Sequence, residues 1–414
     1  MKTILFIFFL LLVGFVPFFG VIDIIGSQWL YLSILNLFPI LFYRNDFLSF
    51  LSSVTLTFKP LLFYIVFVLF CIFSLIFSNN LLLSLVDLSR IVVTLFSILN
   101  FLFLYRISNL SLINISISVS IILLFELLYS YYPLFIYLLD QPYSSIDFSS
   151  LPKALQGVTG NRNVMAANVS FKIPFVIYGI YKSHKWIAIS LSTLLFFAYS
   201  NIFLISSRAS LISLFITLLI FSFFFIFNFK HTSVYRFILY ILPIALFLLF
   251  VSSSNNYDTI GISQKVSSLS SSDTSVSQRL TLYSNALDYI YNHPFIGCGI
   301  GNWKIESLPY WKSLLTGYTV PYHAHNDFLE LTAEIGLLGG IAYLLVFFFF
   351  LFFSLKLIKR NKSTGYLLLS ITIVYFIDAM LNFPLERAIS QVNFILIFIT
   401  SLIIFQNDSK KFLS

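Results

Sequence analysis

The residues best suited to chemistry in this sequence gather where a polar segment passes into an apolar one. This junction holds the run Tyr322–Asp327, in which His323 and His325 stand at alternate positions, and Glu330 follows closely. A neutral imidazole accepts a proton at physiological pH, which few other side chains do unperturbed. His325 is therefore the candidate general base, and Asp327 or Glu330 is near enough in sequence to orient a histidine ring.

Two other roles for these histidines are compatible with the sequence. His325 could cap the helix that follows or form an interfacial hydrogen bond. His323, His325 and Asp327 could ligate zinc, but no cysteine or further histidine stands at a supporting spacing. We therefore predict no metal and no cofactor. Cys71 and Cys298 fall in an apolar run and a polar segment, so no disulfide framework is expected.

The rest of the chain has the composition of a membrane protein. Of its 414 residues, 59% are hydrophobic and only 10% are charged, too few charges to cover a soluble domain. A bilayer core about 30 Å thick takes roughly 20 helical residues, and hydrocarbon requires every backbone group to be bonded internally. The prediction is an all-α polytopic transmembrane bundle of about twelve spans, at 3–20, 28–43, 61–77, 88–105, 113–139, 164–181, 186–205, 209–229, 235–252, 328–355, 364–381 and 391–406.

The basic residues orient this bundle. With the N-terminus inside, every cytoplasmic connection carries lysine or arginine, from Lys2 to Lys410 and Lys411, as the positive-inside rule requires. This explains the net charge of +8, so no nucleic acid partner is expected. The first apolar run resembles a signal peptide, but it lacks a small-residue cleavage site and is long enough to span. We expect it to be retained, with both termini cytoplasmic.

One connection differs from the others. Residues 1–252 hold nine predicted spans with short loops, 253–327 form a large loop on the outer side, and 328–414 hold three spans and a cytoplasmic tail. The loop begins Ser/Asn-rich and flexible. It then shows Leu280, Tyr283, Leu287 and Ile290 at near-helical spacing, which predicts an amphipathic helix over 279–292 that rests on the membrane or caps the bundle.

Arginines at outer loops and helix ends run against the orientation rule. An anionic ligand would explain them, and so would a salt bridge or interfacial snorkelling. Arg387 stands beside Glu386, which favours the second explanation. Arg208 has no acidic neighbour in sequence, which favours the ligand.

Charges inside the spans support a competing function. Asp87, Glu126 and Asp378 fall in or near predicted spans, where charges are costly and often mark ion or proton paths. Asp87 and Arg90 are spaced to pair on one helix. Glu126 and Asp378 have no obvious partner in the sequence, which keeps a transporter as an alternative.

The outer loop and the following span resemble the O-antigen ligase and polymerase superfamily. His325-Asn326, nine residues and Gly336-x-x-Gly339 are similar to its signature. Arg208, after a Ser-rich helix end, and Arg279, at the head of the loop helix, match arginines of the family. The Gly160-Asn-x-Asn163 loop is also similar, although Arg162 stands where the family usually has proline. The resemblance covers roughly residues 155–345.

The resemblance implies a lipid-diphosphate-dependent glycosyltransferase of the bacterial inner membrane with a periplasmic site. The donor would be a glycan on undecaprenyl diphosphate, and the acceptor a sugar hydroxyl of lipid A–core or of a growing glycan. His325 would be the catalytic base, and the substrate-binding residues would be Arg208, Arg279, Asn326, His323 and Asn163. A glycan polymerase and a transferase to protein hydroxyls, both of the same superfamily, are the alternatives ahead of a transporter.

Overall fold

The computed structural model describes residues 2–17, 24–53, 58–107, 110–140, 154–228, 234–253, 274–311 and 322–413. Every secondary-structure element within these ranges is a helix, so the all-α prediction is confirmed. In this part of the chain, ten helices are long and apolar enough to cross a membrane: Ile24–Phe42, Lys59–Phe77, Leu81–Tyr105, Leu112–Leu139, Arg162–Lys182, Lys185–Ile205, Arg208–Phe227, Asp327–Arg360, Lys362–Leu381 and Ala388–Phe405.

Two shorter apolar helices complete the predicted set. Lys2–Phe15 and Val234–Leu249 stand where the first and ninth spans were expected. The loop residues 254–273 and 312–321, with most of the Ser/Asn-rich stretch, lie outside the described residues. The division of the chain at residues 252 and 327 by membrane topology stays a prediction.

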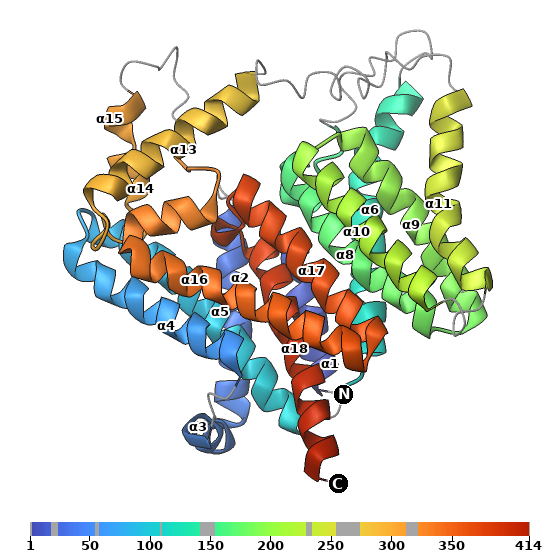
Figure 1. Cartoon of the computed structure of the whole chain (residues 1–414), viewed down its shortest axis with the longest axis horizontal. Coiled ribbons are helices and arrows are strands. Elements are labelled where there is room, and N and C mark those ends of the chain that lie inside the picture. Colours follow the sequence, from blue (N-terminus) through green and yellow to red (C-terminus); the bar gives the residue numbers. More distant parts are fainter. Residues whose placement is uncertain are drawn as a thin grey trace. The chain divides into compact units, whose positions relative to one another are not determined.

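The chain folds into two compact units (Figure 1). The first comprises Met1–Val16, Ser108–Ser270 and Ser354–Tyr375, and the second Pro17–Ile107, Ser271–Phe353 and Phe376–Ser414. Helices α16 (Asp327–Arg360) and α17 (Lys362–Leu381) contribute residues to both units.

The first unit is built around α8. Its 18 most apolar consecutive residues are 83% buried, and they form one core with side chains of α6, α9, α10 and α11. Polar side chains of α8 are enclosed as well, among them Lys172, which is 2% exposed. The elements of this unit are α1 (Lys2–Leu11), η1 (Leu12–Phe15), α6 (Leu112–Asp140), η4 (Gly157–Thr159), α8 (Arg162–Lys182), α9 (Lys185–Ile205), α10 (Arg208–Phe227) and α11 (Val234–Ser253).

The second unit combines spans with the helices of the loop. Its innermost span is α18, of which 94% of the apolar window is buried, and α2 and α5 pack against it. The elements are α2 (Ile24–Phe42), α3 (Arg44–Ser53), α4 (Lys59–Ser74), η2 (Leu75–Phe77), α5 (Leu81–Ile107), α13 (Thr274–Asn292), α14 (Trp303–Glu306), α15 (Leu308–Trp311), most of α16, the end of α17, η6 (Pro384–Glu386) and α18 (Ala388–Leu413).

The predicted loop helix exists, and its apolar residues lie on more than one face. Helix α13 begins at Thr274, earlier than expected. Leu280 and Leu287 are 56% and 54% exposed. Ile290, one of the four predicted apolar residues, enters the core together with Ala286 and Tyr289, and these side chains pack with Cys298, Trp303, Ala324 and Ala333. Periodicity identified the helix, but a helix with apolar residues on two faces does not reveal which face is covered.

Helix α16 is interrupted near its start, and the loop after α13 forms hydrogen bonds with the peptide groups at the interruption. Gly336 has φ 77° and ψ 171°, a conformation that only glycine adopts readily. The peptide groups freed by this break bond to the turn after α13. Cys298 N donates to Ala333 O at 3.1 Å, Gly299 N to Glu334 O at 2.8 Å, and Leu337 N to Pro294 O at 2.9 Å. A side chain at Gly297 or Gly336 would collide with this backbone. We call this arrangement the splice.

Candidate active site

Both predicted histidines lie at the beginning of α16, in the second unit. Asn326 caps the helix, because its Oδ1 accepts N–H groups of Phe328 at 3.0 Å and Leu329 at 3.1 Å. His325, just before the cap, has φ 54°. Left-handed backbone is uncommon for a residue with a side chain, and strain of this kind is concentrated at functional sites. The helix-cap role that was open for His325 therefore belongs to Asn326.

A phenylalanine from the turn between α17 and α18 contacts both histidine rings. Phe383 stacks on His323 with ring centroids 4.3 Å apart and meets His325 edge-on at 5.0 Å. The guanidinium carbon of Arg387 lies 5.0 Å from the same ring centroid. A single aromatic ring thus holds two histidines and an arginine in one group.

Glu330 orients His323 rather than His325. Its Oε1 lies 2.9 Å from His323 Nδ1, and its Oε2 accepts the N–H of Ala324 at 2.8 Å. Burial alone would lower the pKa of His323, but the carboxylates of Glu330 and Glu386 outweigh it and raise the pKa above its ordinary value. Asp327 has a different task, because its Oδ2 accepts the N–H of Leu385 at 3.1 Å.

The pKa of His325 is shifted in the opposite direction from that of His323. Its Nδ1 is buried and has no hydrogen-bond partner among the described residues. Burial, with the nearby charge of Arg279 and smaller effects of His323 and Arg387, lowers the pKa of His325 to about 4. The ring is therefore neutral at physiological pH, and a neutral imidazole has one nitrogen that can accept a proton.

Helix α13 brings Arg279 to this histidine. Tyr283, one turn further along α13, places its hydroxyl 3.2 Å from His325 O and 3.0 Å from Met380 O. This hydroxyl fastens the loop helix to the histidine segment and to the end of α17. Arg279 is half-buried in the preceding turn, so the predicted arginine and the predicted base share one unit and one local site.

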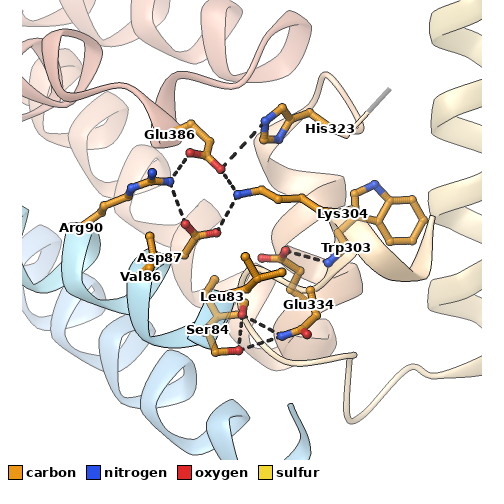
Figure 2. Close-up of polar contacts among 12 residues, drawn as sticks. Leu83, Ser84, Val86, Asp87, Arg90, Trp303, Lys304, His323, Glu334 and Glu386 are labelled. Atoms are coloured by element: carbon orange, nitrogen blue, oxygen red, sulfur yellow. Dashed lines mark hydrogen bonds and ion pairs between the residues drawn. The ribbon is translucent and has the colours of Figure 1, made fainter. Parts of the chain in front are cut away.

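Next to His323, four charged side chains form a closed ring (Figure 2). Arg90 binds Asp87 at 2.8 Å and also binds Glu386, while Lys304 binds Glu386 and lies 3.3 Å from Asp87. His323 Nε2 is 3.9 Å from Glu386. Burial raises the pKa of Glu386, but Lys304 and Arg90 outweigh this and lower it, so the carboxylate stays charged. The ring joins α5, α14 and η6.

A small cavity adjoins this charge ring. It has a volume of about 30 Å³, enough for roughly two water molecules, and its polar lining includes Asp87, Arg90, Glu330, Glu334 and Glu386. Among the residues that the structure describes, no three histidine, cysteine, aspartate or glutamate side chains are arranged to hold a metal ion.

The other two predicted site residues lie in the first unit. Arg208 begins α10, directly after Ser206 and Ser207, and Ser206 has φ 54°. Asn163 is exposed in the first turn of α8, and its N–H donates to Asn161 Oδ1 at 2.9 Å. Within the described ranges, Ser206 and His325 are the two non-glycine residues with positive φ. His325 is a predicted site residue, and Ser206 stands two residues before another, Arg208.

Several charges found partners that the sequence had not indicated. Glu126 binds Lys172 at 2.5 Å, and Asp378 accepts a hydrogen bond from Asn382 at 2.6 Å. The Asp87–Arg90 pair was predicted and is confirmed. Glu386 pairs with Arg90 and Lys304, two partners that its position in the sequence beside Arg387 had not indicated. Phe383, Lys304 and Glu386 were missed as site residues, since aromatic and charged residues in short loops have no periodicity that marks them.

The helices and the polar site at their ends define a polytopic integral membrane protein. Residues 191–344 match the model of the O-antigen ligase family. This segment contains Arg208, Arg279 and His325. This match supports the predicted resemblance to the O-antigen ligase superfamily. No curated protein matches the chain.

Proposed function

We propose that this protein transfers a glycan from undecaprenyl diphosphate to a sugar hydroxyl of lipid A–core at the periplasmic face of the bacterial inner membrane. His325 is the general base in this scheme, and Arg208 and Arg279 bind the diphosphate. Asn163, His323 and Asn326 contribute to substrate binding. The reaction needs neither a metal nor a cofactor, because the donor carries its own leaving group.

The observation that carries the proposal is the state of His325. A buried imidazole nitrogen without a partner costs free energy, and it persists here on a strained backbone. Structural histidines are usually satisfied, as His323 is by Glu330. A base waiting for a substrate hydroxyl has the opposite requirement, since its acceptor nitrogen must stay free.

The chemistry follows from the charges around this nitrogen. The acceptor oxygen attacks the anomeric carbon and gives its proton to His325, while the bond to the diphosphate breaks and the diphosphate leaves with the electron pair. Attack from the face opposite the leaving group inverts the anomeric centre. Arginine suits the diphosphate because its planar fork binds phosphate oxygens in pairs.

The low pKa of His325 is compatible with this role once the donor is bound. Arg279 contributes to lowering the pKa of His325. A diphosphate bound to this arginine brings negative charge close to the ring, and negative charge favours the imidazolium. The base therefore becomes stronger in the complex that uses it, and it stays unprotonated in the free protein.

Substitution of His325 tests the proposal. A His325→Ala variant should lose transfer by about 10²–10⁴-fold, the usual contribution of a positioned general base. The measurement is transfer from lipid-linked glycan in membranes that contain equal amounts of the variant and the parent protein. His184→Ala is the matched control, because this exposed histidine precedes α9. Unchanged transfer by His325→Ala at normal abundance would sink the scheme.

A polymerase or a transferase to protein would use the same residues with another acceptor. A gel of surface polysaccharide from a deletion strain distinguishes a ligase from a polymerase. Loss of the whole ladder with polymer left on the carrier indicates a ligase, whereas core capped by a single repeat indicates a polymerase. A proton-coupled transporter would fail with Asp378→Asn and tolerate His325→Ala, the reverse of the enzyme.

A further inference from the structure

Four exposed apolar side chains lie at the carboxyl end of α13 and in the turn that follows. Leu287 is 54% exposed, Tyr291 84%, Phe295 79% and Ile296 46%. We call these four residues the apolar corner. They belong to the loop segment, outside every candidate span, so the hydrophobicity of a transmembrane helix does not account for them.

The corner is fixed to a spanning helix. It flanks Pro294, whose carbonyl accepts the N–H of Leu337 in the splice, and a Cβ on Gly336 would strike the Phe295 carbonyl. On α16, the first residues after Gly336 also point outward: Leu337 is 40% exposed, Leu338 59% and Ile341 48%. On a membrane-spanning helix such side chains face lipid. The exposed surface of the corner therefore continues a lipid-facing surface.

The segment that follows the corner meets the turn between α4 and α5. Ile300 N donates to Ser74 Oγ at 3.1 Å, and Asn302 Nδ2 donates to Ser78 Oγ at 3.0 Å. This turn is flanked by further exposed apolar side chains at the ends of its two spans: Phe73, Ile76 and Leu82 are 55%, 72% and 76% exposed. The corner thus lies beside the break in α16, and the segment that follows it lies beside the turn that joins α4 and α5.

The geometry points to the apolar corner as a lipid anchor, embedded in the leaflet at this end of the spans. Its partner is the acyl and headgroup boundary of the bilayer, where tyrosine and other aromatic side chains are favoured. Each apolar Å² removed from water contributes roughly 25 cal/mol, so exposed Phe295 and Ile296 favour this location over water. No corner residue carries a charge that would have to be desolvated.

This anchor fixes the position of α13 along the membrane normal. The covered face of α13 packs Ala286, Tyr289 and Ile290 into the second unit, while its carboxyl end is held in lipid. The helix therefore caps the unit and contacts the membrane, the two roles that its sequence left open. Arg279 lies on the same rigid helix, so the anchor sets its distance from the phosphate layer of the leaflet.

Fluorescence quenching tests the anchor directly. A Phe295→Cys variant is labelled with a small environment-sensitive fluorophore and reconstituted in vesicles of phosphatidylethanolamine and phosphatidylglycerol. Part of the lipid carries a nitroxide near its headgroup, and iodide on both sides of the membrane serves as the aqueous quencher. Cys71 and Cys298 are 0% and 2% exposed, so the unsubstituted protein reports background labelling. Ser277→Cys, exposed in the first turn of α13, is the matched control.

We expect the label at position 295 to be quenched by the nitroxide lipid and to be several-fold less sensitive to iodide than the label at position 277. Equal sensitivity to iodide at both positions would overturn the anchor. So would protection from both quenchers at position 295, which would mean that protein covers the corner. The result does not depend on glycan transfer, so the anchor and the proposed function stand or fall separately.

Discussion

The two units contain charge in their apolar surroundings in different ways. In the first unit, Lys172 and Glu126 are 2% and 0% exposed and form a single pair between α8 and α6. In the second unit, the ring of Asp87, Arg90, Lys304 and Glu386 is partly exposed and continues through His323 to Glu330.

The difference indicates which region is structural and which is functional. A closed one-to-one pair neutralises itself and has no exposed group to offer a ligand. The second unit adds to its ion pairs a neutral histidine, His325, whose buried Nδ1 has no hydrogen-bond partner among the described residues. Buried charge in a membrane protein is thus a weak sign of transport when it is matched, and a better sign of a site when a titratable group beside it stays unmatched.

The largest test of this contrast is to break the closed pair. Lys172→Met leaves the Glu126 carboxylate buried alone, and removal of one partner of a buried pair typically costs about 3–5 kcal/mol. We expect a clear fall in the thermal unfolding temperature of the purified protein and in its abundance. The residual folded protein should keep its specific transfer activity.

The double variant Glu126→Leu with Lys172→Met is the control for this experiment. Replacing both charges by apolar side chains is often neutral or stabilising, so the unfolding temperature should return. Loss of specific activity in the stable double variant would contradict a structural role and would make the pair part of the function.

The second test concerns the pKa of His325. The charge of Arg279 contributes to lowering this pKa to about 4, so Arg279→Gln should raise the pKa toward its ordinary value. Diethyl pyrocarbonate modifies the neutral imidazole, and mass spectrometry of the peptide with His325 gives its reactivity against pH. The midpoint should move upward in Arg279→Gln and stay low in Arg279→Lys, which keeps the charge.

This measurement does not require activity, so it can be made even if both arginine variants are inactive.

The lowered pKa of His325 also makes the stability of the folded protein depend on pH. A histidine with a lowered pKa in the folded protein stabilises fully above its ordinary pKa, and this contribution disappears as the pH falls from about 6.5 toward about 4. If the pH midpoint of His325 modification were unchanged in Arg279→Gln, the charge of Arg279 would not act on His325.

The smallest expected effect is at Phe383. Aromatic contacts contribute about 0.5–1.5 kcal/mol beyond burial, and Phe383→Leu removes those with His323 and His325. We expect kcat to fall several-fold with little change in KM or unfolding temperature. Phe348→Leu, on an exposed part of α16, should leave kcat unchanged. An equal fall in kcat in Phe383→Leu and Phe348→Leu would show that Phe383 does not position the histidines.

Local pattern predicted the elements of this protein well and their contacts poorly. Apolar runs located the spans within a few residues because a helix must satisfy its own backbone in lipid. The beginning of a helix directly after His325 and Asn326 was predicted for the same local reason. The partners of these residues were not, because Phe383, Glu386 and Lys304 come from distant loops. The covered face of α13 also depended on tertiary packing, since Leu280 and Leu287 are as apolar as the residues that are buried.

The splice has a consequence for how substrates reach the histidines. Three peptide hydrogen bonds join the turn after α13 to the broken start of α16. Detaching that turn would leave these donors and acceptors unpaired at the margin of the hydrocarbon, at a cost of several kcal/mol for each group there. The segment that carries His325 therefore does not open as a flap does. In the proposed reaction, the donor and the acceptor would therefore bind to a preformed surface, which they would reach by lateral diffusion within the bilayer.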